Sequence, residues 1–343
     1  MDFNHVSRKK PFYPIRENLY TYLRQYERMA DIDVTYSDLL RSNSEIPVYN
    51  KYGNDSLWVT KLYDPSLMEE LNDGLTRIYS LLKTGGDMHA IEHLFVERID
   101  FCTFGNSKPF RIRIMNRLND NHDYYYLKTA DASRVYGLEL EHILSPNRIN
   151  YLVHGNTLIE EHIVGIPGDE FIVHRFDKEG FNKVRLSKEF IKFNERCFLR
   201  LLGDMRAYNF VVDVTPDFDE EQYRIRSIDF DQQCYEGRKN LYLPQFFKDN
   251  LAYVKLAAET MTEKTVEQYK IEERVQTAKR VKASQHKLKS LLDCMATDEI
   301  STDEKTETLK KELADYHCFD EFLRCKSMGE LLALHLNRLL VVK

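Results

Sequence analysis

The stretch LLGDMRAYNFVVDVTPDFDEEQYRIRSIDFDQQC, residues 201–234, contains two apolar runs separated by an acidic segment. The runs 210–214 and 223–228 are rich in the residues that form β-strands, which predicts a β-hairpin with residues 216–221 as its exposed turn. Because a hairpin brings its two ends together, Asn209, just before the first strand, is expected beside Asp229, just after the second. Asp204 lies five residues before Asn209. The hairpin would therefore gather carboxylate and amide groups at one end.

Carboxylate and amide groups in this layout suit phosphoryl transfer. Asp204 is the candidate base that accepts or orients an attacking hydroxyl, and Asn209 and Asp229 are the candidate ligands of a magnesium ion that bridges phosphates. Asp231 is a further candidate, as a second metal ligand or a carboxylate that positions water, and Arg206 is a candidate contact for the transferred phosphate. The other interpretation is that these are ordinary loop residues, since a lone D-x-x-x-x-N match arises easily by chance.

The same segment resembles the catalytic and metal-binding loops of the protein-kinase-like superfamily. Gly203-Asp204, Asn209 and Ile228-Asp229-Phe230-Asp231 follow the H-G-D-x-x-x-x-N … I-D-F/W-D pattern of aminoglycoside phosphotransferases and the D-R-x-x-x-N … I-D-F-G pattern of phosphoinositide kinases. The segment is most similar to P-G-D-M-x-x-x-N-F-G-V … Y-D-Y-D-E of bacterial isocitrate dehydrogenase kinase/phosphatase. The match covers only this short part of the chain. The chain is too short for that whole enzyme, so its phosphatase activity and its substrate are not implied.

The resemblance implies a two-lobed α+β fold that binds ATP and Mg²⁺. We expect a helical N-terminal extension over residues 1–90, a small lobe over 91–164, and a large lobe with C-terminal helices over 165–343. The small lobe is expected to begin with three strands, at 93–102, 110–118 and 123–129, because these runs are apolar and separated by turn residues.

Several small-lobe residues acquire expected roles from the resemblance. The turn after the first strand holds Gly105, Asn106 and Ser107, whose backbone N–H groups would cover the phosphates, although no G-x-G-x-x-G motif is present. Lys128, at the end of the third strand, would hold the α- and β-phosphates. The alternative for Lys128 is an exposed charge on a strand, which would contribute little to stability.

A helix is predicted over residues 131–144, where Asp131 is a plausible N-cap and Ser145-Pro146 ends the pattern. Glu139, at the edge of its apolar face, is the expected ion-pair partner of Lys128, and Glu141 is the second choice. Two more strands are predicted, at 149–153 and 157–164. The resemblance places the hinge there, with backbone groups of Glu161, His162 and Ile163 reading the adenine ring.

Composition limits the classes of protein to which this chain can belong. The net charge of −6 argues against a generic nucleic-acid-binding protein. The six cysteines form no C-x-x-C pair, which is typical of reduced thiols in a cytoplasmic protein. The N-terminus lacks the apolar segment of a signal peptide, and the apolar tail 331–342 is too short to cross a bilayer. We therefore expect a cytoplasmic protein with no membrane span, with export as an effector left open.

The most specific function that these features predict is that of an atypical protein Ser/Thr kinase with a protein acceptor. Three alternatives remain open on the same fold: a small-molecule kinase of the aminoglycoside-phosphotransferase type, an enzyme that transfers AMP, and a nucleotide-binding pseudokinase. The fold does not choose between acceptors. The missing glycine-rich motif favours the pseudokinase, and the presence of Asp204, Asn209 and Asp229 opposes it.

Overall fold

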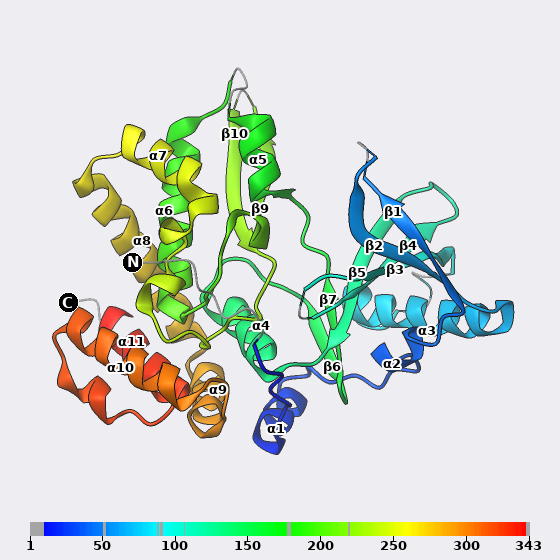
Figure 1. Ribbon diagram of the computed structural model, residues 1–343, viewed down its shortest axis with the longest axis horizontal. Helices are drawn as coiled ribbons and strands as arrows, with labels where there is room; N and C mark the ends of the chain where they lie inside the picture. Colours follow the sequence, from blue (N-terminus) through cyan, green and yellow to red (C-terminus); the bar gives the residue numbers. More distant parts are fainter. Residues whose placement is uncertain are drawn as a thin grey trace. The chain divides into compact units, whose positions relative to one another are not determined.

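The computed structural model describes residues 10–50, 53–87, 89, 92–105, 107–176, 180–218 and 220–340 (Figure 1). The chain mixes helices and strands and divides into two compact units. The sheet unit consists of Pro14–Asp131 and Ile149–His162, and the helical unit consists of Met1–Tyr13, Ala132–Arg148 and Ile163–Lys343. The α+β class expected from the sequence is confirmed.

The sheet unit is built on a seven-stranded sheet in the order β1-β2-β3-β4-β5-β7-β6, with every neighbouring pair antiparallel. Its strands are β1 (Ser44–Tyr49), β2 (Asp55–Leu62), β3 (Leu94–Cys102), β4 (Phe110–Asn116), β5 (His122–Thr129), β6 (Tyr151–His154) and β7 (Thr157–Glu161). The three successive strands expected near residues 93–129 and the two strands that follow the helix are all confirmed.

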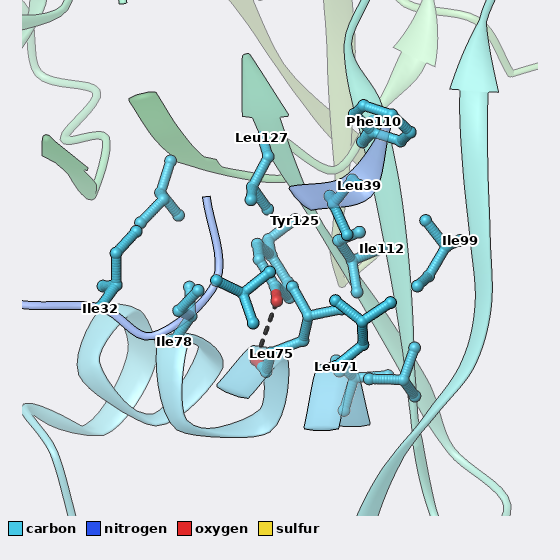
Figure 2. Close-up of a cluster of buried hydrophobic side chains, with 14 of the residues drawn as sticks. Ile32, Leu39, Leu71, Leu75, Ile78, Ile99, Phe110, Ile112, Tyr125 and Leu127 are labelled. Carbon is cyan, nitrogen blue, oxygen red and sulfur yellow. Dashed lines mark hydrogen bonds between the residues drawn. The ribbon is translucent and has the colours of Figure 1, made fainter. Parts of the chain in front are cut away.

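One face of this sheet is buried against helices. The helices of the unit are α1 (Glu17–Gln25), α2 (Tyr36–Leu39) and α3 (Pro65–Thr84). Leu71, Leu75 and Ile78 of α3 share a core with Ile112 and Tyr125 of the sheet (Figure 2). The Tyr125 hydroxyl donates to the carbonyl oxygen of Leu75 at 2.8 Å, so even the polar atom on this face has a partner.

The expected boundary near residue 90 does not separate the units. β2 pairs with β3 through Trp58↔Cys102, so the first 90 residues contribute two strands to the sheet as well as helices. The expectation of a mostly helical extension missed β1, because SEIPVY contains a proline and little alternation. The expected small lobe of 91–164 ends near an observed division, between His162 and Ile163, but its residues Ala132–Arg148 belong to the helical unit.

The helical unit holds a short sheet among many helices (Figure 1). The α-helices are α4 (Ala132–Leu144), α5 (Gly168–Arg175), α6 (Lys183–Arg200), α7 (Leu251–Thr260), α8 (Glu263–Ala283), α9 (Gln285–Thr297), α10 (Asp303–His317) and α11 (Met328–Leu340). The 3₁₀ turns are η2 (Ala207–Asn209), η3 (Lys239–Tyr242), η4 (Pro244–Phe246), η5 (Lys248–Asn250) and η6 (Asp320–Arg324). The sheet has the order β10-β9-β8, with β8 (Ile166–Pro167), β9 (Phe210–Asp217) and β10 (Glu220–Ser227).

Among the helices described here, none combines the length and the apolar character that crossing a membrane would require. No disulfide joins any of the six cysteines, all of which lie in the described ranges.

Candidate functional site

The β9–β10 hairpin predicted from the sequence is present and brings the expected residues together. The two strands pair in register from Phe210↔Ser227 to Asp217↔Glu220. Just beyond the ladder, the backbone N–H of Ile228 donates to the carbonyl oxygen of Asn209 at 3.0 Å. Asn209 therefore lies beside the Ile228–Asp229 segment, as the sequence predicts, although 19 positions separate Asn209 from Ile228 in the chain.

The loop that carries Asp204 is held by backbone hydrogen bonds from two other segments. α6 ends at Arg200, and the chain turns through Leu201 in the left-handed region. The N–H of Gly203 then donates to the carbonyl oxygen of Gln232 at 3.2 Å, and the N–H of Asp204 donates to that of Leu241 at 3.2 Å. Asp204 itself has a φ of +56°, a conformation that disfavours most side chains but is tolerated by Asp. Such a residue persists only where its surroundings hold it in place.

The Asp204 side chain is mostly buried and paired with a neighbouring arginine. Arg206 Nε donates to Asp204 Oδ1 at 2.8 Å. Burial raises the pKa of Asp204 to about 6, the Arg206 guanidinium opposes that rise, and the negative charges of Asp229 and Glu236 add to it. A carboxylate with a pKa near 6 is ionised at neutral pH and is a stronger base than an exposed one, which suits a group that accepts a proton.

Asn209 has a side chain whose orientation is fixed by a hydrogen bond. Its Nδ2 donates to the backbone carbonyl oxygen of Asp204 at 2.7 Å. A carbonyl oxygen only accepts hydrogen bonds, so the amide nitrogen must face it and Oδ1 must point the other way. Asn209 thus presents an oxygen, the ligand type that Mg²⁺ prefers, beside the acidic segment that begins at Asp229.

Asp229 and Asp231 are joined by an arginine that the sequence interpretation missed. Arg134 of α4 donates from a single nitrogen, Nη1, to Asp229 Oδ1 at 2.9 Å and to Asp231 Oδ1 at 2.7 Å. The N–H of Asp231 also donates to Asp229 Oδ1 at 3.0 Å. The contact between α4 and this loop is tight, because a Cβ at Gly137 would stand 2.9 Å from the Cβ of Phe230.

A signal for Arg134 exists in the sequence. α4 is buried on nearly every side, so each of its charged residues must have a partner of opposite charge. Glu139 is paired with Lys287 of α9, Glu141 with Arg200 of α6, and Arg134 with the two aspartates. A search for buried charges in the predicted helix, and not only for glutamates, would have found Arg134.

Lys128 lies in the sheet unit and differs from the expectation in its burial. It is 7% exposed, and its Nζ donates to Glu160 Oε2 of β7 at 2.8 Å. The expectation of an exposed strand lysine is therefore wrong, because the lysine and its carboxylate partner are both withdrawn from solvent. Lys128 and Glu139 belong to different units, and the pair expected between them stays a prediction.

The turn expected to cover phosphates lies between β3 and β4. Gly105 adopts a φ of +86°, which glycine accommodates without strain, and Ser107 is partly buried. Asn106 lies outside the described residues. The roles expected for Gly105, Asn106 and Ser107 at the phosphates remain predictions.

The residues expected to form the hinge follow β7. The N–H of Glu161 donates to the carbonyl oxygen of Asn150 at 3.0 Å, so this donor is already used within the β6–β7 hairpin. His162 Nδ1 lies 3.1 Å from the Tyr126 hydroxyl, and burial lowers the pKa of His162. The roles expected for Glu161, His162 and Ile163 at an adenine ring remain predictions.

Two general findings bear on the site. Within the part of the chain that the structure describes, no three His, Cys, Asp or Glu side chains are gathered so that they could hold a metal ion. The role of Asn209 and Asp229 as Mg²⁺ ligands stays a prediction, based on the amide and carboxylate oxygens that such ions accept. No protein-family model matches the sequence, and no curated protein matches it.

Proposed function

We propose that this protein is a Mg²⁺- and ATP-dependent phosphotransferase of the protein-kinase-like type that acts on a protein hydroxyl. The observation that carries the proposal is the hydrogen bond at 3.0 Å from the N–H of Ile228 to the carbonyl oxygen of Asn209, at the end of the hairpin opposite its turn. It supports the proposal because it brings the amide of Asn209 to the acidic loop of Asp229, within the same unit as Asp204. The order of elements from β3 onward supports it too: three antiparallel strands, a helix, two strands and then a mainly helical region are what the sequence resemblance implies.

The proposed roles follow from the contacts of each side chain. Asp204 takes the proton of the acceptor hydroxyl, and Arg206 holds Oδ1 so that Oδ2 is left to face that hydroxyl. Asn209 and Asp229 would hold Mg²⁺, which when bound offsets the charge of the phosphate oxygens. The raised pKa of Asp204 favours proton transfer at neutral pH without removing the negative charge that attracts the hydroxyl.

Mass spectrometry of the intact protein, and of added protein acceptors, after incubation with Mg-ATP tests the proposal. A gain of phosphate that is lost in Asp204→Asn supports it. A gain of AMP shows nucleotidyl transfer on the same fold, and phosphate on an aminoglycoside but on no protein shows a small-molecule kinase. Nucleotide binding with no transfer to any acceptor supports the pseudokinase and contradicts the proposal.

The pseudokinase is the second candidate because of one specific observation. Arg134 places a positive charge on the two acidic residues that a metal-dependent kinase would use, at 2.9 Å and 2.7 Å. A protein that binds nucleotide without transferring phosphate does not need those carboxylates for metal. Comparing ATP binding with and without Mg²⁺ separates the two, since only the phosphotransferase requires the metal.

A further inference from the structure

Arg134 bridges the acidic pair in the way that a divalent cation would. Its Nη1 is shared between Asp229 Oδ1 and Asp231 Oδ1, and its Nη2 lies 3.4 Å from the carbonyl oxygen of Ile228. The guanidinium is almost fully buried, with 2% of the side chain exposed. One cationic group thus uses an oxygen of each carboxylate and balances part of their charge.

The positive charge on Arg134 is permanent. An arginine side chain keeps its proton at any pH a protein experiences, so it cannot leave the two carboxylates by titration. α4 is buried along its length and leaves no space for a Cβ between Gly137 and Phe230, so the helix is held against the acidic loop. A second divalent cation between the same two oxygens would be repelled by the positive charge of the guanidinium and would overlap with its atoms.

The two aspartates are not equivalent. Asp229 has 35% of its side chain exposed and Asp231 has 16%. Asp229 Oδ1 accepts from both Arg134 Nη1 and the N–H of Asp231, which orients that carboxylate through one oxygen. Asp229 is thus the more accessible of the two to an ion, and its segment is the one that lies beside Asn209.

We propose that Arg134 takes the place of a second divalent cation, so that the site binds one Mg²⁺ through Asp229 and Asn209. Asp231 then serves as the counter-ion of Arg134 and not as a metal ligand. This inference rests on the proposed function, because it concerns the metal that a phosphotransferase would use. Arg134 of α4 thus limits the number of ions that bind, and Asp231 does not have the role of second metal ligand that the sequence predicts.

The number of ions bound tests the inference without any measurement of activity. Mn²⁺ is titrated into the full chain in the presence of a non-hydrolysable ATP analogue, and free Mn²⁺ is counted by electron paramagnetic resonance. We expect one Mn²⁺ for each wild-type chain and one for Asp231→Asn. Arg134→Gln is expected to bind two, and Arg134→Gln combined with Asp231→Asn is expected to return to one.

The outcomes separate the inference from the proposed function. Two Mn²⁺ on the wild type with one on Asp231→Asn would overturn the inference and leave the phosphotransferase standing. A folded Arg134→Gln protein that still binds one ion would overturn it too, as would an Asp231→Asn protein that binds none. No Mn²⁺ and no analogue bound by the wild type would remove both proposals. If Arg134→Gln does not fold, the comparison of wild type with Asp231→Asn still decides the role of Asp231.

Discussion

Arg206 Nε lies 2.8 Å from Asp204 Oδ1, and the same guanidinium reaches Asp249 Oδ2 through Nη1 at 3.3 Å. It also lies over the ring of Phe247, with its central carbon 5.3 Å from the ring centroid. Arg206 is therefore held by a second carboxylate and an aromatic ring, and it holds Asp204 in turn. The orientation and the basicity of the candidate base both depend on this arginine.

Asp204→Asn should abolish most of the phosphate transfer while leaving ATP affinity near that of the wild type. Asparagine keeps the size of the side chain but cannot take a proton, so we expect a loss of roughly two or more orders of magnitude in turnover. Radiolabel transfer and calorimetric ATP titration measure the two quantities. Equal turnover in wild type and variant would remove Asp204 from the mechanism.

The same variant should not be less stable at pH 8. Because the pKa of Asp204 is raised to about 6 from 3.8, the ionised carboxylate destabilises the folded state above pH 6, and this cost disappears as the pH falls towards 4. Thermal unfolding of Asp204→Asn at pH 8 should thus occur at or above the wild-type temperature. A large decrease would mean that Asp204 has a structural role in its loop.

Transfer activity should depend on pH through Asp204. If Asp204 is the base, kcat/KM should rise with pH and reach half its maximum near pH 6. Arg206→Ala removes the charge that lowers the pKa of Asp204, so the midpoint should move above pH 6. Arg185→Ala, which breaks an ion pair with Glu220, is the matched control and should leave the midpoint unchanged. A midpoint that does not move in Arg206→Ala would contradict the role given to the pair.

Asp229→Ala and Asn209→Ala should each weaken ATP binding only when metal is present. Both remove an oxygen ligand of the proposed ion, so we expect a decrease of roughly tenfold or more in Mg-ATP affinity. Calorimetric titration with Mg²⁺ and with EDTA gives the two affinities. ATP binding that does not depend on metal and is retained in Asp229→Ala would contradict the assignment of Asp229 as a metal ligand. Asp213→Ala is the control, because Asp213 lies within the same hairpin but not at the end that carries Asn209 and Asp229.

Lys128→Ala should destabilise the protein, because it removes the cation that pairs with the buried carboxylate of Glu160. Breaking a buried ion pair on one side typically costs about 3–5 kcal/mol, so urea unfolding should shift clearly to lower concentrations. Lys128→Met combined with Glu160→Gln removes both charges and should recover much of that stability. If Lys128 also contacts ATP phosphates, the double variant should be folded but bind ATP more weakly. Unchanged ATP affinity in the folded double variant would reduce Lys128 to a structural role.

The stability of the helical unit should fall in acid because of a buried histidine pair. His335 Nε2 donates to the Phe198 carbonyl oxygen at 3.0 Å, so in the neutral ring its Nδ1 accepts from His317 Nε2 at 2.9 Å. Burial lowers the pKa of His335 to about 3, below the ordinary value of 6.5. Stability is therefore complete above pH 6.5 and is lost as the pH falls from 6.5 towards 3, by up to about 1.4 kcal/mol per pH unit.

Unfolding of His335→Gln by urea between pH 7 and pH 4 tests this dependence. The variant should show a shallower loss of stability than the wild type, since glutamine can still donate to Phe198 but does not titrate. His89→Gln is the control, because the His89 side chain is 92% exposed and its removal should not change the slope. An identical slope in wild type and His335→Gln would mean that other groups cause the acid sensitivity.

The sequence predicts local elements well where capping and alternation agree. Asp64 and Pro65, a cap and a proline at the first helical position, begin α3, and Gly85, at a φ of +66°, ends it. Apolar residues from Ile271 to Met295 recur largely at helical spacing, yet the chain forms two helices that meet at Ser284, whose N–H donates to the carbonyl oxygens of both Arg280 and Val281. Serine favours helix ends because its hydroxyl forms hydrogen bonds with nearby backbone groups that would otherwise bond within the helix. The spacing of apolar residues does not reveal this effect, so it does not predict the break.

The candidate site shows the same division between local and distant information. The hairpin follows from the apolar runs of one segment, so the proximity of Asn209 to Asp229 could be predicted. The contacts of Lys128 with Glu160 and of Glu139 with Lys287 could not, because they come from other elements and the family pattern contains no position for them. Arg134 was overlooked for a related reason, since the pattern that marks the acidic loop contains no position for it.

Gly137 gives the acidic loop a vulnerability that no charged residue reveals. A methyl group at this position would press on Phe230 at 2.9 Å and on the Cβ of Gln233 at 3.2 Å, so alanine would displace the segment between the two aspartates. A natural variant at Gly137 would therefore shift the acidic loop while every acidic and basic residue remained in the sequence. Inspection of the motif alone would classify such an allele as intact, and only the spacing between helix and loop would show that it is not.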